Sequence, residues 1–349
     1  MQIYGCKQFK THIMKTTRTQ FRNNSKALLL AGMLSTVLFT SCTYNDDADP
    51  IIIDSLEISG EELIQSIQDN RDDAMQIFNV DGSAGAVIVA EQGTNLVFGP
   101  NAFKDADGDL VTGSVEIILM EIYKKADMVL SKLPTNAMNG NGDVQTILSA
   151  GEFYVNASQN GDPVFSNGTF QIFAPSDTFD PEMTIFTPID GCDDTDCDVV
   201  WGENPVGQVV QGEGMGPNGT YVIGYTGFRD TFGWTNLDRW YDYQGPKTLI
   251  TASVPEGYNA TNSNVYVAYV GLEGLALLDI YDENAQLFTE HYGQMPIGQD
   301  VHFIFVSVQN GQYIYAIQST TIELDHLEAI TDLQPTTEAE LFALIDLLP

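Results

Sequence analysis

Residues 114–119 read Ser-Val-Glu-Ile-Ile-Leu, and residues 169–173 read Thr-Phe-Gln-Ile-Phe. A period of two residues places alternate side chains on opposite faces of a strand. Similar runs, rich in β-branched or aromatic residues and bounded by Gly, Asn, Asp or Pro, occur at 86–89, 95–98, 152–155, 220–225, 248–254, 264–270, 301–308 and 312–317. Many short strands at this spacing are typical of β-sandwiches. The sequence therefore predicts a mainly β chain with two β-sandwich domains.

Helices are expected only near the two ends of the folded part. Residues 60–68 predict a short helix with Glu61 and Glu62 in its first turn, where the helix dipole favours acids. Near the C-terminus, apolar residues at helical spacing follow Thr336-Thr337, and Glu340 three residues on completes a capping-box pattern. The second segment predicts a C-terminal amphipathic helix.

Prolines and a Gly-rich run from Gly202 to Gly219 interrupt the strand pattern, so we expect the domain junction there. The expected organisation has six parts. These are a signal peptide at 1–41, with Met14 as an alternative start; an acidic tether and short helix at 42–73; a first β-sandwich at 74–190; a disulfide loop and Gly/Pro-rich junction at 191–219; a second β-sandwich at 220–325; and a tail with a helix at 326–349.

The charge is strongly acidic, with 48 Asp and Glu against 14 Lys and Arg and a formal net charge of -34. Six of the bases and none of the acids lie in residues 1–41, so the remainder carries -40. Binding to a phosphate backbone depends on Lys and Arg, and an acidic body repels polyanions and anionic lipid surfaces. The charge excludes nucleic acid as a partner.

The N-terminal segment has the order of a secretory signal. Four bases between residues 15 and 26 precede an apolar stretch from Ala27 to Phe39, and Cys42 follows directly after Thr40 and Ser41. At about 1.5 Å per residue, this stretch makes a helix of about 20 Å, which is shorter than a bilayer core of about 30 Å. We therefore expect it to target the chain without spanning a membrane.

A cysteine after small residues at the end of such a segment resembles the lipobox of bacterial lipoproteins. The resemblance implies that Cys42 is lipidated and anchors the chain to a membrane; a secreted protein in which Cys42 is incidental is the alternative. The acidic stretch 43–50 is similar to the export signal of Bacteroidota surface lipoproteins, and it reads equally well as a solvated linker. We expect a lipid anchor in the outer membrane, with the protein facing the cell exterior.

Cys192 and Cys197 bracket the loop Asp-Asp-Thr-Asp. In an oxidising compartment these two cysteines can close a small loop. A single CxxxxC pattern without a second pair or a nearby His is a poor zinc signal. The sequence therefore predicts a disulfide, with the acids of the loop either solvated at a hairpin tip or free to bind a cation.

A resemblance to a known family rests on segments in both halves of the chain. They include Gly-Thr-Asn-Leu-Val-Phe-Gly-Pro-Asn-Ala-Phe at 93–103 and Phe-Gly-Trp-Thr-Asn-Leu-Asp-Arg-Trp at 232–240, with shorter ones at 111–115, 121–123, 127–131, 302–304 and 315–317. Together they resemble a family of Bacteroidota surface lipoproteins of unassigned function. The first half is also distantly similar to the β-sandwich shared by ankyrins, netrin receptors and zonula occludens proteins, which implies an interaction module.

Three aspartates at alternate positions form the strongest local cluster of candidate ligands. Asp105, Asp107 and Asp109 surround Gly108, and Glu116 follows eleven residues after the first aspartate. Carboxylates in a tight turn can direct several oxygens at one centre, which suits calcium. The spacing departs from an EF-hand loop, and a hairpin tip that uses Asp and Gly for turn geometry is the alternative. Calcium is the only cofactor that the sequence suggests.

A second candidate site is aromatic and comprises Trp234, Trp240, Tyr241 and Tyr243. Such a group can form a flat platform on which sugar rings stack. The two tryptophans are six residues apart, so in a strand they face the same side, as inward core residues would. We favour core filling over a ligand platform.

The sequence lacks the HExxH, G-x-S-x-G, Walker and G-x-G-x-x-G patterns. We therefore expect no catalytic residues, and a lipid-anchored, non-enzymatic surface protein that serves in binding, adhesion or assembly. The partner would be a surface glycan or a protein. A glycan-binding lipoprotein of a nutrient-uptake complex is the first alternative, and a calcium-dependent hydrolase is the second.

Overall fold

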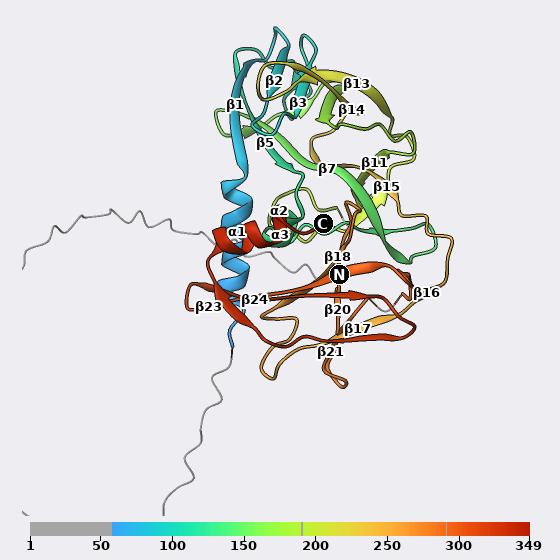
Figure 1. Cartoon of the computed structure of the whole chain (residues 1–349). Coiled ribbons are helices and arrows are strands. Elements are labelled where there is room, and N and C mark those ends of the chain that lie inside the picture. The colour runs from blue at the N-terminus through green and yellow to red at the C-terminus, as the bar shows by residue number, and fades with distance from the viewer. Residues whose placement is uncertain (1–57, 190, 291) are drawn as a thin grey trace, which may run out of the picture. The chain divides into compact units, whose positions relative to one another are not determined.

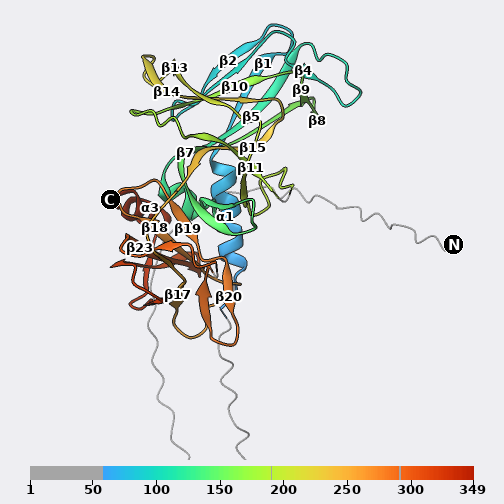
Figure 2. The same ribbon diagram turned by 90° about the vertical axis from the view of Figure 1, so that its right-hand side faces the viewer.

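The computed structural model describes residues 58–189, 191–290 and 292–349, which belong to one compact unit (Figures 1 and 2). Strands make up nearly half of this part, and three helices accompany them. The prediction of a mainly β fold of sandwich type, with a helix near each end, is confirmed. The expected signal peptide, Met14, Cys42 and the acidic tether up to residue 57 lie outside the described residues.

The larger sheet of the first half contains eight strands. Its order is β1 (Met75–Asp81), β5 (Ser114–Ile122), β7 (Val144–Gln159), β15 (Gly233–Trp240), β11 (Thr184–Pro188), β12 (Trp201–Glu203) and β6 (Asn136–Met138), with β8 (Asp162–Pro163) beside β7. Strand β6 pairs with both β12 and β7, so the pairings close five strands into a ring. We call β7, β15, β11, β12 and β6 the strand ring.

A five-stranded sheet faces the larger one. Its order is β13 (Val209–Met215), β14 (Tyr221–Arg229), β10 (Phe170–Pro175), β3 (Asn95–Phe98) and β2 (Ala86–Val89), and a short pair, β4 (Phe103–Lys104) with β9 (Phe165–Ser166), adjoins it. Alternate residues of both sheets turn inward, among them Leu96 and Ile172 from one and Ile117 and Phe153 from the other, all fully buried. This interleaving makes the first half a β-sandwich.

The second half contains two further sheets. One has the order β20 (Ile280–Asp282), β21 (Leu287–Thr289), β17 (Ile250–Ser253) and β25 (His326–Ala329); the other has β19 (Leu275–Leu277), β18 (Asn264–Tyr269), β23 (Asp300–Gln309), β24 (Gln312–Thr321) and β26 (Gln334–Thr336); β16 (Lys247–Thr248) pairs with β22 (Met295–Pro296). Asn310 and Gly311 join β23 to β24 with φ angles of 52° and 71°. Both residues take the left-handed conformation that a two-residue hairpin loop requires.

Three helices pack against the strands: α1 (Glu61–Asp73), α2 (Lys125–Leu130) and α3 (Glu338–Asp346). Glu61 and Glu62 occupy the first turn of α1, as expected, and the helix continues five residues beyond the predicted end. At the start of α3, the Thr337 hydroxyl accepts the N–H of Glu340, and the Glu340 carboxylate accepts the N–H of Thr337. The predicted capping box is confirmed.

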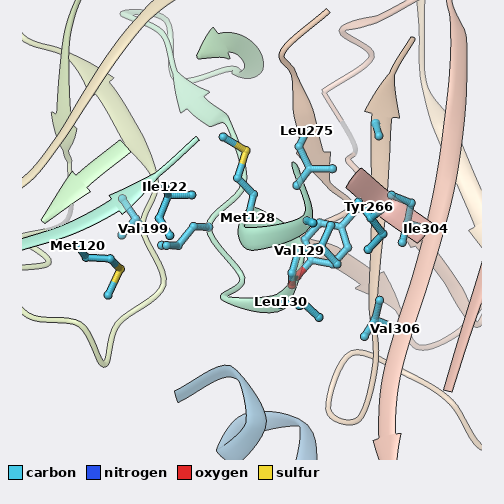
Figure 3. Close-up of a cluster of buried hydrophobic side chains, with 14 of the residues drawn as sticks. Met120, Ile122, Met128, Val129, Leu130, Val199, Tyr266, Leu275, Ile304 and Val306 are labelled. Carbon is cyan, nitrogen blue, oxygen red and sulfur yellow. Dashed lines mark hydrogen bonds between the residues drawn. The ribbon is translucent and has the colours of Figure 1, made fainter. Parts of the chain in front are cut away.

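One hydrophobic core joins the two halves (Figure 3). Met128, Val129 and Leu130 of α2 lie between Met120 and Ile122 of β5 on one side and residues of the second half on the other, which include Tyr266, Leu275, Ile304 and Val306. Backbone hydrogen bonds also cross the halves, as from Thr135 N–H to the carbonyl oxygen of Leu275 at 2.9 Å. We call this cluster the joint core.

The strand pairing corrects the expected start of the second sandwich at residue 220. Strands β13, β14 and β15 all pair within the first half: β14 with β10, and β15 with β7 and β11. The Gly-rich segment within the expected junction at 191–219 includes β13, a strand and not a linker. The expected C-terminal tail contributes β25 and β26 to sheets before α3 begins.

Candidate functional site

The aspartates predicted to bind calcium lie in an exposed turn after β4. Oδ1 of Asp105 accepts the backbone N–H groups of Asp107 at 3.0 Å and Asp109 at 2.9 Å. Gly108, with φ at 89°, supplies the left-handed residue of this turn. Glu116 lies on β5, outside the turn. Across the described ranges, no three His, Cys, Asp or Glu side chains lie together as metal ligands. Calcium in this loop therefore stays a prediction.

The structure separates the two tryptophans of the expected aromatic platform. Trp234 is 1% exposed, and its Nε1 donates to the carbonyl oxygen of Asp194 at 2.7 Å. Trp240 is only half-buried, and its Nε1 donates to Oε2 of Glu203 at 2.8 Å. Both rings lie on the face of β15 that packs against the joint core, as the six-residue spacing predicted. Trp234 fills the core, whereas Trp240 borders solvent.

The two tyrosines of the expected platform connect the halves. The hydroxyl of Tyr241 donates to Oε1 of Gln299 at 3.0 Å, and that of Tyr243 donates to the carbonyl oxygen of Ile297 at 2.9 Å. The ring centroids of these tyrosines are 6.0 Å apart and tilted. Of the four platform residues, Trp240 is the one that lines an open hollow.

That hollow lies at one end of the strand ring and has a volume of about 410 Å³. Carboxylates, amides, a guanidinium and one indole line it, from Asn139, Gln145, Glu182, Arg239, Trp240 and Asp242. The Arg239 guanidinium is held by an ion pair from Nε to Oδ2 of Asp180 at 2.7 Å. An indole beside several fixed polar groups is the combination that sugar-binding sites use. We call it the Trp240 hollow.

Cys192 and Cys197 form a disulfide, as predicted, with their Cα atoms 5.9 Å apart. The loop between them is docked and not a free hairpin tip. Nη1 of the buried Arg71 donates to the carbonyl oxygens of Thr195 and Cys197, while Trp234 donates to that of Asp194. Burial lowers the pKa of Arg71, and the nearby Asp198 carboxylate opposes that shift. The loop backbone therefore supplies acceptors to buried donors.

Sequence reasoning missed a pair of buried acids on the strand ring. Glu152 of β7 and Asp238 of β15 are both 0% exposed. Burial raises the pKa of each carboxyl group far above its ordinary value, and the charge of Asp238 raises that of Glu152 further. With 48 acids in the chain, no pattern distinguishes this pair. The hydrolase alternative requires two carboxylates that are open to a substrate. Both of these side chains are enclosed in this structure.

The five-stranded sheet carries a second surface of interest on its outer face. Register aligns Val87, Val97, Gln171 and Phe228 in one row across β2, β3, β10 and β14. A second row contains Val89, Asn95, Phe173, Thr226 and Val210. We call these two rows the outer apolar face. Val87 and Val210 are 65% and 45% exposed, Val97 and Phe228 are half-buried, and Asn95, Phe173 and Thr226 in the second row are buried.

Comparisons of the chain with protein-family models and with curated proteins give no match. In the part that the structure describes, no helix is long and apolar enough to cross a membrane. The candidate sites therefore rest on the geometry of the chain itself.

Proposed function

We propose that the protein is a lipid-anchored, non-enzymatic interaction module on the outer membrane that binds a protein partner through its outer apolar face. The observation that carries this proposal is the pair of apolar rows across the five-stranded sheet. An antiparallel sheet with one solvated face ordinarily shows polar side chains on that face. Here the first row presents Val87, Val97 and Phe228 beside the polar Gln171, and apolar side chains that lie together on a surface are typical of a protein interface.

The packing of β13 encloses the centre of the outer apolar face. A Cβ added at Gly214 would lie 2.2 Å from Cδ1 of Phe173, and one at Gly212 would lie 2.1 Å from Oγ1 of Thr226. The glycines of β13 therefore leave room for the Phe173 ring, which is 3% exposed. The valines that stay exposed around it, on a body with a charge of -40 after residue 41, fit a partner with an apolar patch and a basic rim.

The anchor is tested by metabolic labelling with palmitate and by protease treatment of intact cells. Cys42→Ala should abolish labelling, whereas Cys192→Ala, which removes a disulfide cysteine, should keep it. Protease added to intact cells should degrade the wild-type protein if it faces the exterior. Labelling that persists without Cys42, or protection from protease in intact cells, contradicts the proposed location.

The binding surface is tested by photo-crosslinking on intact cells. A photoreactive residue at position 87 or 210 should give the same discrete adduct, because Val87 and Val210 lie on one face. Position 324 is the matched control, since Leu324 is 70% exposed but lies in the second half. No adduct at positions 87 and 210, or the same adduct from all three positions, contradicts the proposal.

Glycan binding is the second candidate function, and the Trp240 hollow favours it. One face of an indole with carboxylate, amide and guanidinium groups around it can stack on a sugar ring and bind its hydroxyls. Affinity electrophoresis against surface polysaccharides should then show retardation that Trp240→Ala removes. Tyr221→Ala is the control, because Tyr221 is an exposed aromatic residue on a different surface. Equal retardation of both variants contradicts a sugar site here.

A further inference from the structure

Four polar side chains form a compact block on the inner face of the strand ring. Glu152 of β7 lies opposite Asn236 of β15, and Ser149 lies opposite Asp238. A register shift between these pairs accommodates one extra residue in β7, so that Glu152 and Ser149 share a face. Ser149 is 8% exposed, and the other three are 0% exposed. The block lies among aromatic residues of the joint core, which include Trp234, Trp240 and Phe186.

The two acids of this block have few well-aligned hydrogen-bond donors. Oε1 of Glu152 receives only a long contact from Nδ2 of Asn236, at 3.5 Å. Oε2 of Glu152 and both carboxylate oxygens of Asp238 accept no aligned hydrogen bond from any described residue. The Ser149 hydroxyl, the backbone N–H of Ala150 and the Asn236 amide lie close enough to Asp238 to draw its pKa downward, but the hydroxyl is aligned to donate to Oδ1 of Asn236, at 3.1 Å. Three fully buried acceptor atoms are left without an aligned donor.

The nearest buried cation does not complete the block. Arg71 lowers the pKa of Glu152 through its charge. Its guanidinium, however, donates its hydrogen bonds to backbone carbonyl oxygens and not to the Glu152 carboxylate. Nε donates to the backbone carbonyl oxygen of Ser131, Nη1 to those of Thr195 and Cys197, and Nη2 to that of Lys132. Two buried carboxylates without a contacting cation or donor would cost several kcal/mol if they were ionised and alone. The block therefore requires a further positive group or a change of protonation.

Protonation of the acids is the alternative, because burial raises the pKa of each carboxyl group far above its ordinary value. Acids that are simply protonated would give no response to calcium. Asp238 acts on Glu152 through its charge, with no hydrogen bond between the two groups among the contacts of the described side chains. The register places Glu152 and Asp238 diagonally on one face of β7 and β15, each opposite an amide or a hydroxyl side chain. Carboxylate, amide and hydroxyl oxygens on one face are the ligand types that a hard cation takes.

We propose that Glu152 and Asp238, with Oδ1 of Asn236 and Oγ of Ser149, bind a calcium ion inside the strand ring. Oxygen ligands without His or Cys favour calcium or magnesium over zinc or copper. Calcium tolerates the irregular geometry of a site built on two strands, and magnesium requires a near-ideal octahedron. The ion cross-links β7 to β15 and neutralises the charges of both acids.

The block lies one residue pair away from the Trp240 hollow along the strands. Trp240 lies opposite Ile147, which is the next pair on the same face of the strands after Asp238 and Ser149. Trp240 borders the open hollow, whose carboxylates come from Glu182 and Asp242. An acidic mouth raises the local concentration of cations. The site is independent of the proposed binding surface, which lies on the other sheet.

Calorimetric titration of the folded chain with calcium, after dialysis against a chelator, tests the site. The wild-type protein should bind one calcium ion, and its unfolding temperature should rise on calcium addition. Asp238→Asn and Glu152→Gln keep the side-chain shapes and remove one charge each, so each should weaken calcium binding about 100-fold or more. Asp107→Ala is the control; it lies in the exposed Asp105 turn and should bind calcium as the wild-type protein does.

Unfolding in the presence of chelator supplies a second readout for the same variants. Each neutralised variant should melt above the calcium-free wild-type protein, because one uncompensated buried charge is gone. Two outcomes overturn the proposal: a wild-type protein that neither binds calcium nor gains stability from it, or a calcium response that Asp107→Ala removes and the two buried-acid variants keep. A buried-acid variant that fails to fold even with calcium also counts against it, since the charge would then be required for another reason.

Discussion

Nη1 of Arg71 donates a hydrogen bond to the carbonyl oxygen of Cys197 at 3.0 Å, across 126 positions of the chain. This contact fixes helix α1 to the disulfide loop. The other donors of the same guanidinium hold the segment after α2, through the carbonyl oxygens of Ser131 and Lys132. One 2%-exposed side chain thus joins three segments that the sequence assigns to different parts.

Arg71→Met should therefore destabilise the protein strongly. The substitution leaves four carbonyl oxygens without their donor, and we expect a loss of about 3 to 5 kcal/mol in the free energy of unfolding. Urea unfolding followed by far-UV circular dichroism measures it. Lys124→Met is the matched control, because the ion pair of Lys124 with Asp346 is exposed and is worth at most about 1 kcal/mol. Equal losses from both variants would contradict the bridging role.

Trp234→Phe and Trp240→Phe should differ in the same assay. The first removes the hydrogen bond to Asp194 and opens space in a fully buried site, which should cost about 2 to 4 kcal/mol. The second removes a contact at the edge of an open hollow and should cost about 1 kcal/mol or less. A larger loss from Trp240→Phe would mean that the hollow is closed in solution.

The period-two pattern located most strands because burial on alternate faces is a local property. Residues 86–89, 95–98 and 264–270 coincide with β2, β3 and β18 to within one residue. The capping box of α3 could also be predicted from the sequence, because its two hydrogen bonds join residues that are three positions apart. The pairing of these strands could not be predicted. β15 pairs with β7, whose partner residues lie about 80 to 90 positions earlier, and no local sequence pattern identifies such partners.

Strand β13 was missed because glycine is a poor strand former in isolation. Its glycines are required by Phe173, which lies some 40 residues away and becomes a neighbour only through β14. The candidate sites show the same limit. The exposed Asp105 cluster is contiguous in sequence, whereas Glu152 and Asp238 come together only when β7 and β15 pair.

Gly214→Ala tests the steric role of that glycine. A Cβ at this position would lie 2.2 Å from Cδ1 and 2.4 Å from Cε1 of Phe173, so the ring must move off the sheet. We expect a loss of about 1 to 3 kcal/mol in the free energy of unfolding. Gly99→Ala is the control, because its Cβ would meet no atom within 4 Å. An unchanged stability in Gly214→Ala would show that Phe173 has room to shift.

The pH dependence of stability has a contribution from Asp127 in the first turn of α2. Burial raises the pKa of Asp127 from 3.8 to about 6, and the repulsion from Asp346 of α3 adds to the shift while Lys124 opposes it. Between these two pH values the folded state binds more protons than the unfolded chain. The free energy of unfolding should therefore fall as the pH rises from about 4 to about 6.

Asp127→Asn removes this titration, because the amide stays neutral in both states. The variant and the wild-type protein should be equally stable near pH 4. The variant should be more stable by about 1 to 2 kcal/mol at pH 7, a figure already reduced for partial exposure of the carboxyl group. Urea unfolding of both proteins at pH 4, 5, 6 and 7 measures the difference. A difference that is constant across this range, or that favours the wild-type protein at pH 7, would show that Asp127 is solvated or paired with Lys124 when folded.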